Sequence, residues 1–484
     1  MRPLQSTKGA KEGLGDKVVD CNPNLARVLP RLFKPAQRVA VAKIIHSARV
    51  SVYKKSTYNL PYQKRKEHVM RVLVLGNGAR EHALAWRISQ SPECKNLFVW
   101  PGNGGTEQCG WNVHLNAEQL IDHVAGLCPD YVVIGPETFL ADGLVDKLAE
   151  KGIPAFGPTR AAAKVETSKE AALQLMQEAK VPHPKSWTFP NPHVVATFVQ
   201  GYNKPVAVKP DGLTGGKGVQ LCSNPKEAEN AANLCGELYP DQPIVVQELL
   251  QGREVSVFCF TDGYHVSPLV VACDYKRLLD GDQGPNTGGM GSYSWPRFWN
   301  KPLEEEILQW IVMPILGKME LKGTPFVGML YAGLMLTKEG PKVLEFNARF
   351  GDPEAQVILP LLQGDLLDIM LACTQGRLDK VQVSWNHALH AVGVVMAFQG
   401  YPGKCEGGHP VTRRYTRKQA SALVFHGSTR LEDKSLVTDG ASGRVLTVVG
   451  TGTPVSHARE MAYYETDKWG FFGATWREDI AAGN

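Results

Sequence analysis

The segment from Lys342 to Glu354 places a carboxylate and an amide two residues apart, in a pattern typical of a strand. Side chains alternate faces along a strand, so Glu345 and Asn347 point the same way. Leu344 and Phe346 then face the core. Magnesium prefers oxygen ligands and often bridges nucleotide phosphates, so the pair predicts a site for magnesium and ATP. By itself, however, a Glu-x-Asn pair is more common as an exposed polar strand face.

A glycine-rich segment from Asp211 to Val219 follows Lys209. Its glycines let the backbone fold over phosphates with N–H groups pointing inward, and Lys209 and Lys217 add positive charge against a triphosphate. No Gly-Lys-Ser/Thr closes the segment, so it is not a Walker loop. A nucleotide lid and a flexible hairpin both fit, and the later Glu345 favours the lid. Arg349 adds a planar cation for a phosphoryl or carboxylate group, and we predict catalytic roles for Lys209 and Arg349.

Two further segments carry polar groups suited to ligands. Gln247 to Leu250 ends a strand and can offer adenine a backbone N–H, a carbonyl and a side-chain amide. Glu254 can accept hydrogen bonds from ribose hydroxyls. The loop from Gly284 to Gly291, which follows Asp274 to Arg277, holds too many glycines for simple core packing. We expect it to form a nest for a substrate anion.

The elements that position these groups begin at Arg71. Val72 to Leu75 is typical of a buried strand, Gly76 to Arg80 of a tight turn, and Glu81 to Ser89 of a helix. Further strands at residues 97–100 and 131–134 end in Gly/Pro turns, where an open parallel sheet presents ligands. This part of the chain therefore predicts a small α/β domain.

A second region follows a helical stretch that ends at Lys180. Its short strands and glycine turns predict a mixed α+β body with a Gly-rich lid. The strands are expected at residues 206–209, 244–247, 255–260, 331–336 and 343–346. Alternating segments at residues 389–397, 422–426 and 444–449 predict a smaller C-terminal domain that contains a sheet.

Charge is uneven along the chain, whose formal net charge is +5. Residues 1–70 hold 15 Lys and Arg against 4 Asp and Glu, whereas the remainder holds 38 against 44. A nucleic-acid binder would carry its basic surface on the folded body, so this distribution argues against that class. The first 70 residues instead predict a disordered extension, an organellar transit segment, or a start site placed upstream of Met70.

Cysteine usage and hydropathy exclude other classes. The ten cysteines are scattered singly from Cys21 to Cys405, with no spacing that would hold zinc or build a small disulfide framework. No stretch approaches the roughly 20 apolar residues that a membrane helix needs. We therefore expect a soluble protein of about three domains in a reducing compartment.

Four longer motifs carry a resemblance to a known family. They are Asn77-Gly78-Ala79-Arg80-Glu81-His82-Ala83-Leu84-Ala85-Trp86, Pro101-Gly102-Asn103, Gly284-Pro285-Asn286-Thr287-Gly288-Gly289-Met290-Gly291 and Leu344-Glu345-Phe346-Asn347-Ala348-Arg349-Phe350-Gly351-Asp352-Pro353-Glu354. On these motifs the chain, from Arg71 to near its C-terminus, resembles the phosphoribosylamine–glycine ligase family of the ATP-grasp superfamily.

The resemblance implies an α/β and α+β multidomain fold. A Rossmann-like pre-ATP-grasp domain is expected, then an ATP-grasp core with the Gly-rich lid, then a small mixed C-terminal domain similar to that of biotin carboxylase. The expected limits are 1–70 for the extension, 71–165, 166–376 with the lid at about 182–250, and 377–484.

The resemblance also implies the site residues. Glu345 and Asn347 would hold Mg²⁺ or Mn²⁺. ATP would contact Lys169, Lys209, Gly215, Gly216, Lys217, Gly218, Gln247, Glu248, Leu250 and Glu254. The other substrates would contact Gly78, Arg80, Glu81, Asn103, Asp274, Lys276, Asn286, Thr287, Gly288, Gly289 and Arg349. The chain departs from the family's pattern at Gln247, where Glu is frequent, and at the shortened segment 237–241.

The implied reaction joins glycine to 5-phosphoribosylamine through a glycyl phosphate, giving glycinamide ribonucleotide, ADP and phosphate in purine biosynthesis. The implied partners are these small molecules and ATP, without nucleic acid or membrane, in a monomer or weak dimer. The expected location is the cytoplasm, or a plastid or mitochondrion if residues 1–70 are a transit segment. The alternatives are a nicotinamide-dependent oxidoreductase, a catalytically silent binding protein and a ligase for another acid.

Overall fold

The computed structural model describes residues 70–117, 120–215, 218–414 and 422–484. The expectations for residues 1–69, and for Gly216 and Lys217 of the lid loop, lie outside the described residues. Among the residues that it describes, no helix is both long and apolar enough to cross a membrane.

The N-terminal part is a parallel sheet with the strand order β3-β2-β1-β4-β5. Its central strand β1 carries four fully buried apolar residues, Val72 to Leu75, because helices cover both faces of such a sheet. The strands are β1 (Met70–Gly76), β2 (Cys94–Pro101), β3 (Trp111–Asn112), β4 (Tyr131–Ile134) and β5 (Ala155–Phe156). Helix α3 (Ala79–Ile88) follows the glycine turn and begins two residues earlier than the expected Glu81.

The lid has its own small sheet, with the order β6-β9-β7-β8. Its strands are β6 (Ser186–Phe189), β7 (Val206–Pro210), β8 (Gln220–Cys222) and β9 (Ile244–Glu248). Helices α9 (Pro192–Tyr202) and α10 (Pro225–Leu238) pack on this sheet around a separate apolar core. Each helix starts with an Asn cap, Asn191 or Asn224, followed by proline, which is a strong helix-start signal.

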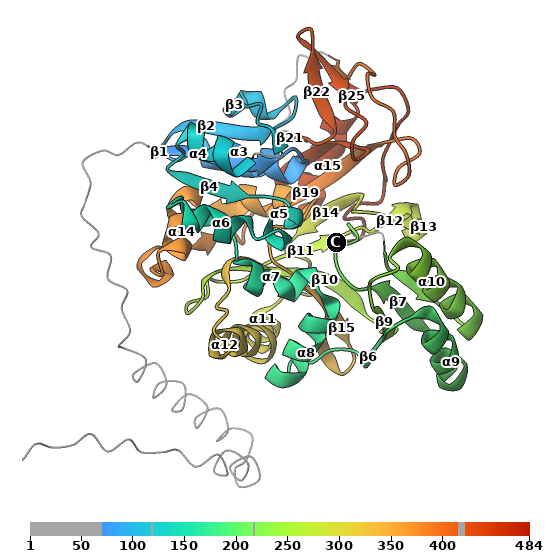
Figure 1. Cartoon of the computed structure of the whole chain (residues 1–484). Coiled ribbons are helices and arrows are strands. Elements are labelled where there is room, and N and C mark those ends of the chain that lie inside the picture. Colours follow the sequence, from blue (N-terminus) through green and yellow to red (C-terminus); the bar gives the residue numbers. More distant parts are fainter. Residues whose placement is uncertain (1–69, 118–119, 216–217, 415–421) are drawn as a thin grey trace, which may run out of the picture. The chain divides into compact units, whose positions relative to one another are not determined.

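The largest sheet joins the core of the protein to its C-terminal segment (Figure 1). Its order is β16-β15-β10-β11-β14-β19-β24-β21, and β26 pairs with β19. The strands are β10 (Arg253–Asp262), β11 (Val270–Asp274), β14 (Gly291–Ser294), β15 (Val327–Thr337), β16 (Gly340–Asn347), β19 (His390–Phe398), β21 (Ala422–His426), β24 (Arg444–Gly452) and β26 (Ala474–Thr475). The long C-terminal strands thus extend the central sheet through the pairing of β14 with β19.

The helical stretch expected to end at Lys180 is two helices, α7 (Arg160–Thr167) and α8 (Lys169–Ala179). The break falls at Ser168, whose hydroxyl accepts a hydrogen bond from the Ala171 amide and so caps α8. This break matters for function because it places Lys169 in the first turn of α8.

The remaining elements cover these sheets or close their loops. The α-helices are α4 (Leu120–Leu127), α5 (Glu137–Ala141), α6 (Leu144–Glu150), α11 (Lys301–Ile307), α12 (Met313–Leu321), α13 (Glu354–Ile358), α14 (Leu366–Thr374) and α15 (Val455–Thr466). The short 3-10 helices are η2 (Thr106–Gln108), η4 (Asp280–Asp282), η6 (Leu359–Leu361) and η7 (Leu378–Lys380), and η5 (Leu308–Val312) is a π-helix. The short strands are β12 (Arg277–Leu279), β13 (Gln283–Asn286), β17 (Leu362–Gln363), β18 (Ser384–Trp385), β20 (Thr412–Arg413), β22 (Thr429–Glu432), β23 (Ser435–Thr438) and β25 (Trp469–Gly470).

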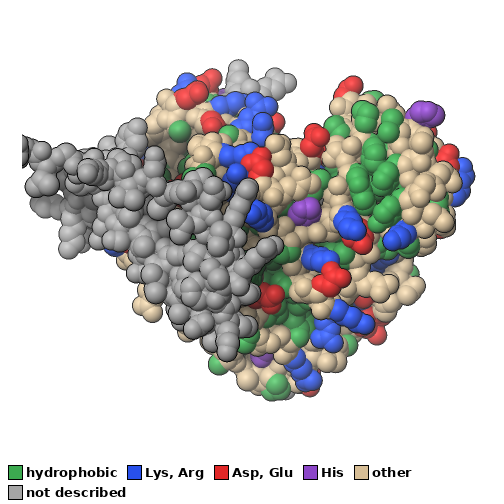
Figure 2. All heavy atoms as spheres, turned by 90° about the horizontal axis from the view of Figure 1, so that it is seen from below, with side chains coloured by type: hydrophobic (Ala, Val, Ile, Leu, Met, Phe, Trp, Pro, Cys, Tyr) green, Lys and Arg blue, Asp and Glu red, His purple; other side chains and the backbone are tan. Residues whose placement is uncertain are grey.

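Basic and acidic side chains lie side by side over the described part of the face in Figure 2. A nucleic-acid surface would instead gather Lys and Arg along one groove or stripe. This face therefore gives no support to nucleic-acid binding.

Candidate active site

Strand β16 carries the predicted metal ligands at its carboxyl end. Glu345 pairs with Gly333 of β15, and directly before this pair the register shifts by one residue, which leaves Leu344 in a β-bulge. The bulge breaks the alternation of faces, so the prediction that Leu344 faces the core is wrong. Leu344 is only partly buried and lines a pocket together with Glu345. Phe346 borders the same pocket but is buried, as expected.

That pocket, of about 140 Å³, lies between the lid, helices α7 and α8, and strand β16. Its walls combine apolar side chains with a few converging charged groups, as ligand sites do. The lining residues are Glu137, Val165, Glu166, Lys169, Ala172, Leu173, Met176, Ser186, Lys209, Gly212, Leu213, Thr214, Gly215, Val219, Val245, Gln247, Leu344, Glu345, Phe346, Asn347 and Arg349. The structure thus brings together Lys169, Lys209, Gly215, Gln247, Glu345, Asn347 and Arg349 from the predicted set.

Three lysines act electrostatically on the Glu345 carboxylate. Burial alone would raise the pKa of Glu345, but Lys276, Lys209 and Lys169 together lower it below its usual value. The Lys169 ammonium donates a 2.6 Å hydrogen bond to the Gly212 carbonyl, which ties the lid loop to α8. Lys169 and Lys209 line the pocket beside Glu345, so their ammonium groups can receive an anionic ligand.

Lys209 is the most buried of these lysines, with 7% of its surface exposed. Its ammonium donates a 2.7 Å hydrogen bond to Oε1 of Gln247. Burial lowers the pKa of Lys209 to about 8, against the opposing effect of Glu345. A bound phosphate would raise the pKa of Lys209 again, because a nearby anion stabilises the protonated ammonium.

Arg349 is enclosed by two carboxylates that the sequence did not predict. Its Nε donates a 3.1 Å hydrogen bond to Glu137, and its Nη2 lies 2.9 Å from Glu166. Burial would lower the pKa of Arg349, but Glu166 and Glu137 raise it above its usual value. Arg349 also lowers the pKa of Glu137 to about 2, in opposition to burial. The guanidinium thus joins the first domain to strand β16.

The donor atoms at the end of β16 fit a magnesium or manganese ion. Glu345 offers a carboxylate to the pocket, and Oδ1 of Asn347 accepts a long hydrogen bond of 3.3 Å from Arg349. Nδ2 of Asn347 is buried without a hydrogen-bond partner among the described residues. No group of three or more His, Cys, Asp and Glu in the described part of the chain could hold a metal. Nucleotide phosphates and water would therefore have to complete the coordination.

The residues predicted at the start of α3 are held in a dense network. Glu81 is buried and accepts hydrogen bonds from the Gly78 amide at 2.8 Å and from Arg80 Nε at 2.6 Å. Asn103 donates to the carbonyls of Asn77 and His426 through its side-chain amide. These side chains shape the turn, so a ligand here would meet mainly the N-terminus of α3 and its backbone N–H groups.

The Gly284 to Gly291 loop folds against the end of β11. Oδ1 of Asp274 is buried without a hydrogen-bond partner among the described residues, and burial raises the pKa of this carboxyl. Gly289 has φ +111°, and a Cβ there would lie 2.7 Å from that oxygen, so only glycine fits. Thr287 accepts from the Gly289 amide, and Asn286 ends strand β13.

Other predicted ATP residues lie beside the pocket rather than in its wall. Glu248 and Leu250 lie at and beyond the end of β9, and Gly218 lies in the lid loop. Glu254 forms an ion pair with Lys276 across the neighbouring strands. Burial would lower the pKa of Lys276, but Glu254 raises it above its usual value. Glu254 is therefore already engaged by Lys276 where a ribose contact was predicted.

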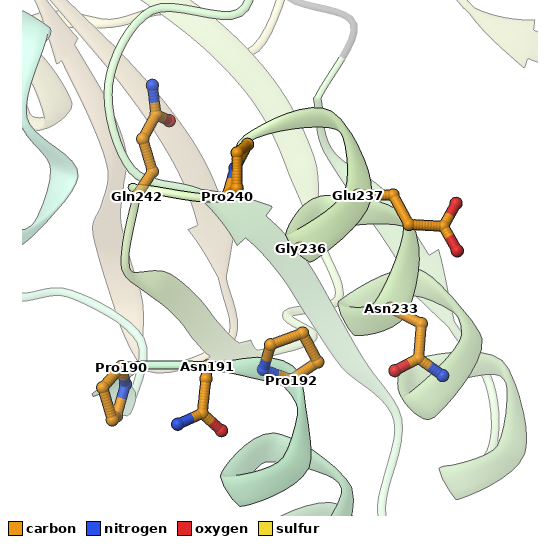
Figure 3. Close-up of a pocket in the computed structure, with 8 residues that line it drawn as sticks. All are labelled: Pro190, Asn191, Pro192, Asn233, Gly236, Glu237, Pro240 and Gln242. Atoms are coloured by element: carbon orange, nitrogen blue, oxygen red, sulfur yellow. The ribbon is translucent and has the colours of Figure 1, made fainter.

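A larger cavity, of about 370 Å³, lies on the lid, away from β16 (Figure 3). It borders the shortened segment 237–241, with Glu237 and Pro240 in its wall. Figure 3 shows that the side chains of Glu237 and Gln242 point away from one another. With one ionisable residue and no converging groups among its lining residues, this cavity is not the centre of chemistry.

Sequence reasoning missed four residues that organise the site: Glu137, Glu166, Ser186 and Arg444. Glu137 lies three residues after the end of strand β4, in the turn that follows a parallel strand, a position that could have indicated it. Arg444 comes from β24 and donates to the carbonyls of Gly288 at 2.7 Å and Asp352 at 2.8 Å. No local pattern indicated Arg444, because its partners lie 156 and 92 residues away.

Comparison with known proteins shows which family shares this architecture. Three domain models of the phosphoribosylglycinamide synthetase family match: the N domain at residues 70–166, the ATP-grasp (A) domain at 167–355 and the C domain at 391–483. The Streptomyces coelicolor phosphoribosylamine–glycine ligase is 42% identical over 85% of this chain and 99% of its own length. The chicken trifunctional purine biosynthetic protein adenosine-3 is 43% identical over 85% of this chain, which spans 42% of that protein.

Solved structures agree with these matches. The phosphoribosylamine–glycine ligase of Thermotoga maritima has a TM-score of 0.74 at 33% identity, over 85% of this chain and 100% of that one. A biotin carboxylase domain of Hydrogenobacter thermophilus has a TM-score of 0.65 at 13% identity, over 84% and 91%, which shows a shared fold. These matches confirm the expected three-part ATP-grasp architecture. The chain therefore belongs to the phosphoribosylglycinamide synthetase family.

Proposed function

We propose that the protein joins glycine to 5-phosphoribosylamine at the expense of ATP, giving glycinamide ribonucleotide, ADP and phosphate. The observation that carries the proposal is the pocket in which lysines of the lid and α8 face Glu345 and Asn347 of β16. Such a pocket can hold a triphosphate between cations on one side and a metal on the other. The alternative of a nicotinamide-dependent oxidoreductase has no comparable support.

In the proposed reaction, a carboxylate oxygen of glycine attacks the γ-phosphorus of ATP and the bond to the bridging oxygen breaks, which leaves ADP. The amine of 5-phosphoribosylamine then attacks the carbonyl carbon of the glycyl phosphate. Phosphate leaves, and the amine gives up a proton as the amide forms. No protein nucleophile is needed, so the protein's contribution is positioning and charge neutralisation.

Lys209 and Lys169 would bind the phosphates of ATP, since both ammonium groups line the pocket. Glu345 and Asn347 would hold Mg²⁺ or Mn²⁺, which would neutralise charge as the phosphoryl group moves. Arg349 was predicted to be catalytic. Its ion pairs with Glu137 and Glu166 support a role in holding the end of β16 in place. We propose in addition that Arg349 contacts the transferred phosphoryl group directly.

The other substrates would lie towards the first domain and the glycine loop. The N-terminus of α3, next to Gly78, suits the phosphate of 5-phosphoribosylamine. Oδ1 of Asp274, which has no hydrogen-bond partner in the described ranges, offers an acceptor for a substrate amine. We further propose that the protein works as a monomer or weak dimer in the cytoplasm, or in an organelle if residues 1–70 are a transit segment, with domain limits at 71–165, 166–376 and 377–484.

The decisive assay measures ADP formation with glycine and 5-phosphoribosylamine supplied together and each alone. The proposal expects stoichiometric ADP and glycinamide ribonucleotide only when both are present. Parallel reactions with alanine and with β-alanine in place of glycine test for a ligase of another acid. ADP formation that ignores either substrate, or that prefers another acid, would overturn the proposal.

A further inference from the structure

Three polar side chains lie in a row on one face of the lid sheet. Ser186 of β6 is directly opposite Gln247 of β9, and Gln247 is opposite Ala207 of β7. Lys209 follows Ala207 by two residues, so it points to the same face and lies diagonal to Gln247. All three polar residues line the candidate pocket.

The hydrogen bonds in this row have one consistent direction. The Ser186 hydroxyl donates to the Pro184 carbonyl at 2.9 Å, so its oxygen is left to accept. It accepts a 3.1 Å hydrogen bond from Nε2 of Gln247. Oε1 of Gln247 then accepts from the Lys209 ammonium, which can only donate. A flipped Gln247 amide would set its NH₂ group against another donor.

The hydrogen bond to Gln247 fixes the position of the Lys209 ammonium without cancelling its positive charge. Gln247 is uncharged, whereas the neighbouring Lys276 is paired with the carboxylate of Glu254. The positive charge of Lys209 therefore stays available for an incoming phosphate.

We infer that Ser186 is a positioning residue for nucleotide binding, which acts through the Gln247 amide to hold the Lys209 ammonium in place while leaving it charged. The inference rests on the proposed function, because Lys209 matters in this way only if a nucleotide binds the pocket. Ser186 is not expected to touch the phosphates itself.

The test measures binding of a non-hydrolysable ATP analogue, adenylyl imidodiphosphate, with Mg²⁺ by calorimetry on the full chain between pH 7 and 9.5. Ser186→Ala should weaken binding roughly threefold to tenfold, the usual effect of one lost hydrogen bond. Ser186→Thr keeps the hydroxyl and should restore it. Ser223→Ala, at an exposed serine of the same lid, is the matched control and should bind as the unaltered protein does.

The pH profile separates positioning from simple packing. In the unaltered protein, binding should weaken as the pH rises through about 8 and Lys209 loses its proton. Gln247→Glu should move that midpoint to higher pH. The inference is overturned if Ser186→Ala binds normally, if Ser186→Thr fails to restore binding, or if Gln247→Glu leaves the midpoint in place. An unaltered protein that binds no nucleotide would instead overturn the proposed function, and the inference with it.

Discussion

The backbone amide of His426 donates a 2.8 Å hydrogen bond to Nδ1 of His82, a residue 344 positions earlier in the chain. Because Nδ1 accepts, His82 must be neutral with its proton on Nε2. Burial, reinforced by His426, lowers the pKa of His82 to about 3, and burial lowers that of His426 to about 4. This contact joins the first domain to the C-terminal segment.

The two histidines should make stability depend on pH in the mildly acidic range. Their folded pKa values lie below the ordinary value of 6.5, so the unfolded chain takes up protons first as the pH falls. Their contribution to the free energy of unfolding is complete above pH 6.5. Below that pH it is lost progressively, at about 1.4 kcal/mol per pH unit for each imidazole. Urea titrations at pH 7.0, 6.0 and 5.2 would measure the loss. His426→Gln should show roughly half the slope, and an unchanged slope would contradict this account.

Lys209→Ala should impair ATP use far more than glycine use. The substitution removes a buried ammonium from the pocket and leaves Oε1 of Gln247 without its donor. We expect KM for ATP to rise by about tenfold or more, the equivalent of one charge-assisted hydrogen bond, with KM for glycine nearly unchanged. Lys226→Ala, on an exposed part of α10, serves as the control. Equal changes in the KM for ATP and the KM for glycine would contradict the assignment of Lys209 to the nucleotide site.

Glu345→Gln and Asn347→Leu should each raise the Mg²⁺ concentration needed for half-maximal rate and lower kcat. The first variant keeps shape but removes the negative charge opposite the cation, and the second removes an oxygen ligand. Rates across a magnesium titration, with a melting curve for each variant, provide the measurement. Two folded variants with normal metal dependence would show that these residues are only a polar strand face.

Glu166→Ala should destabilise the protein strongly. It leaves the buried Arg349 guanidinium with a single carboxylate and also removes the acceptor of the Ala348 amide at 2.7 Å. Breaking a buried ion pair from one side costs about 3 kcal/mol or more. Glu339→Ala, which removes the exposed partner of Lys342, should leave the melting temperature close to its original value. Similar melting temperatures for both variants would mean that the Arg349 cluster does not hold the domains together.

Local patterns predicted the elements well because buried strands and glycine turns depend on neighbouring residues. The apolar run at residues 131–134 is β4 with the same limits, and the Glu345 and Asn347 pair does lie in the pocket. Leu344 was misplaced because a β-bulge depends on pairing with another strand and leaves no trace in the alternation. The carboxylates around Arg349 were missed for a related reason, since Glu137 and Glu166 reach it only after distant segments have packed.

The continuous central sheet has a consequence for how the protein is made. One edge of strand β14 (Gly291–Ser294) is covered by β19 (His390–Phe398). During synthesis, about a hundred further residues must therefore emerge from the ribosome before that edge is covered. An uncovered strand edge is a template for pairing with other chains. Synthesis that stalls in this interval would therefore give a product with most of its nucleotide pocket in place and an unpaired strand edge. We expect such a product to aggregate unless chaperones bind it until the C-terminal strands are made.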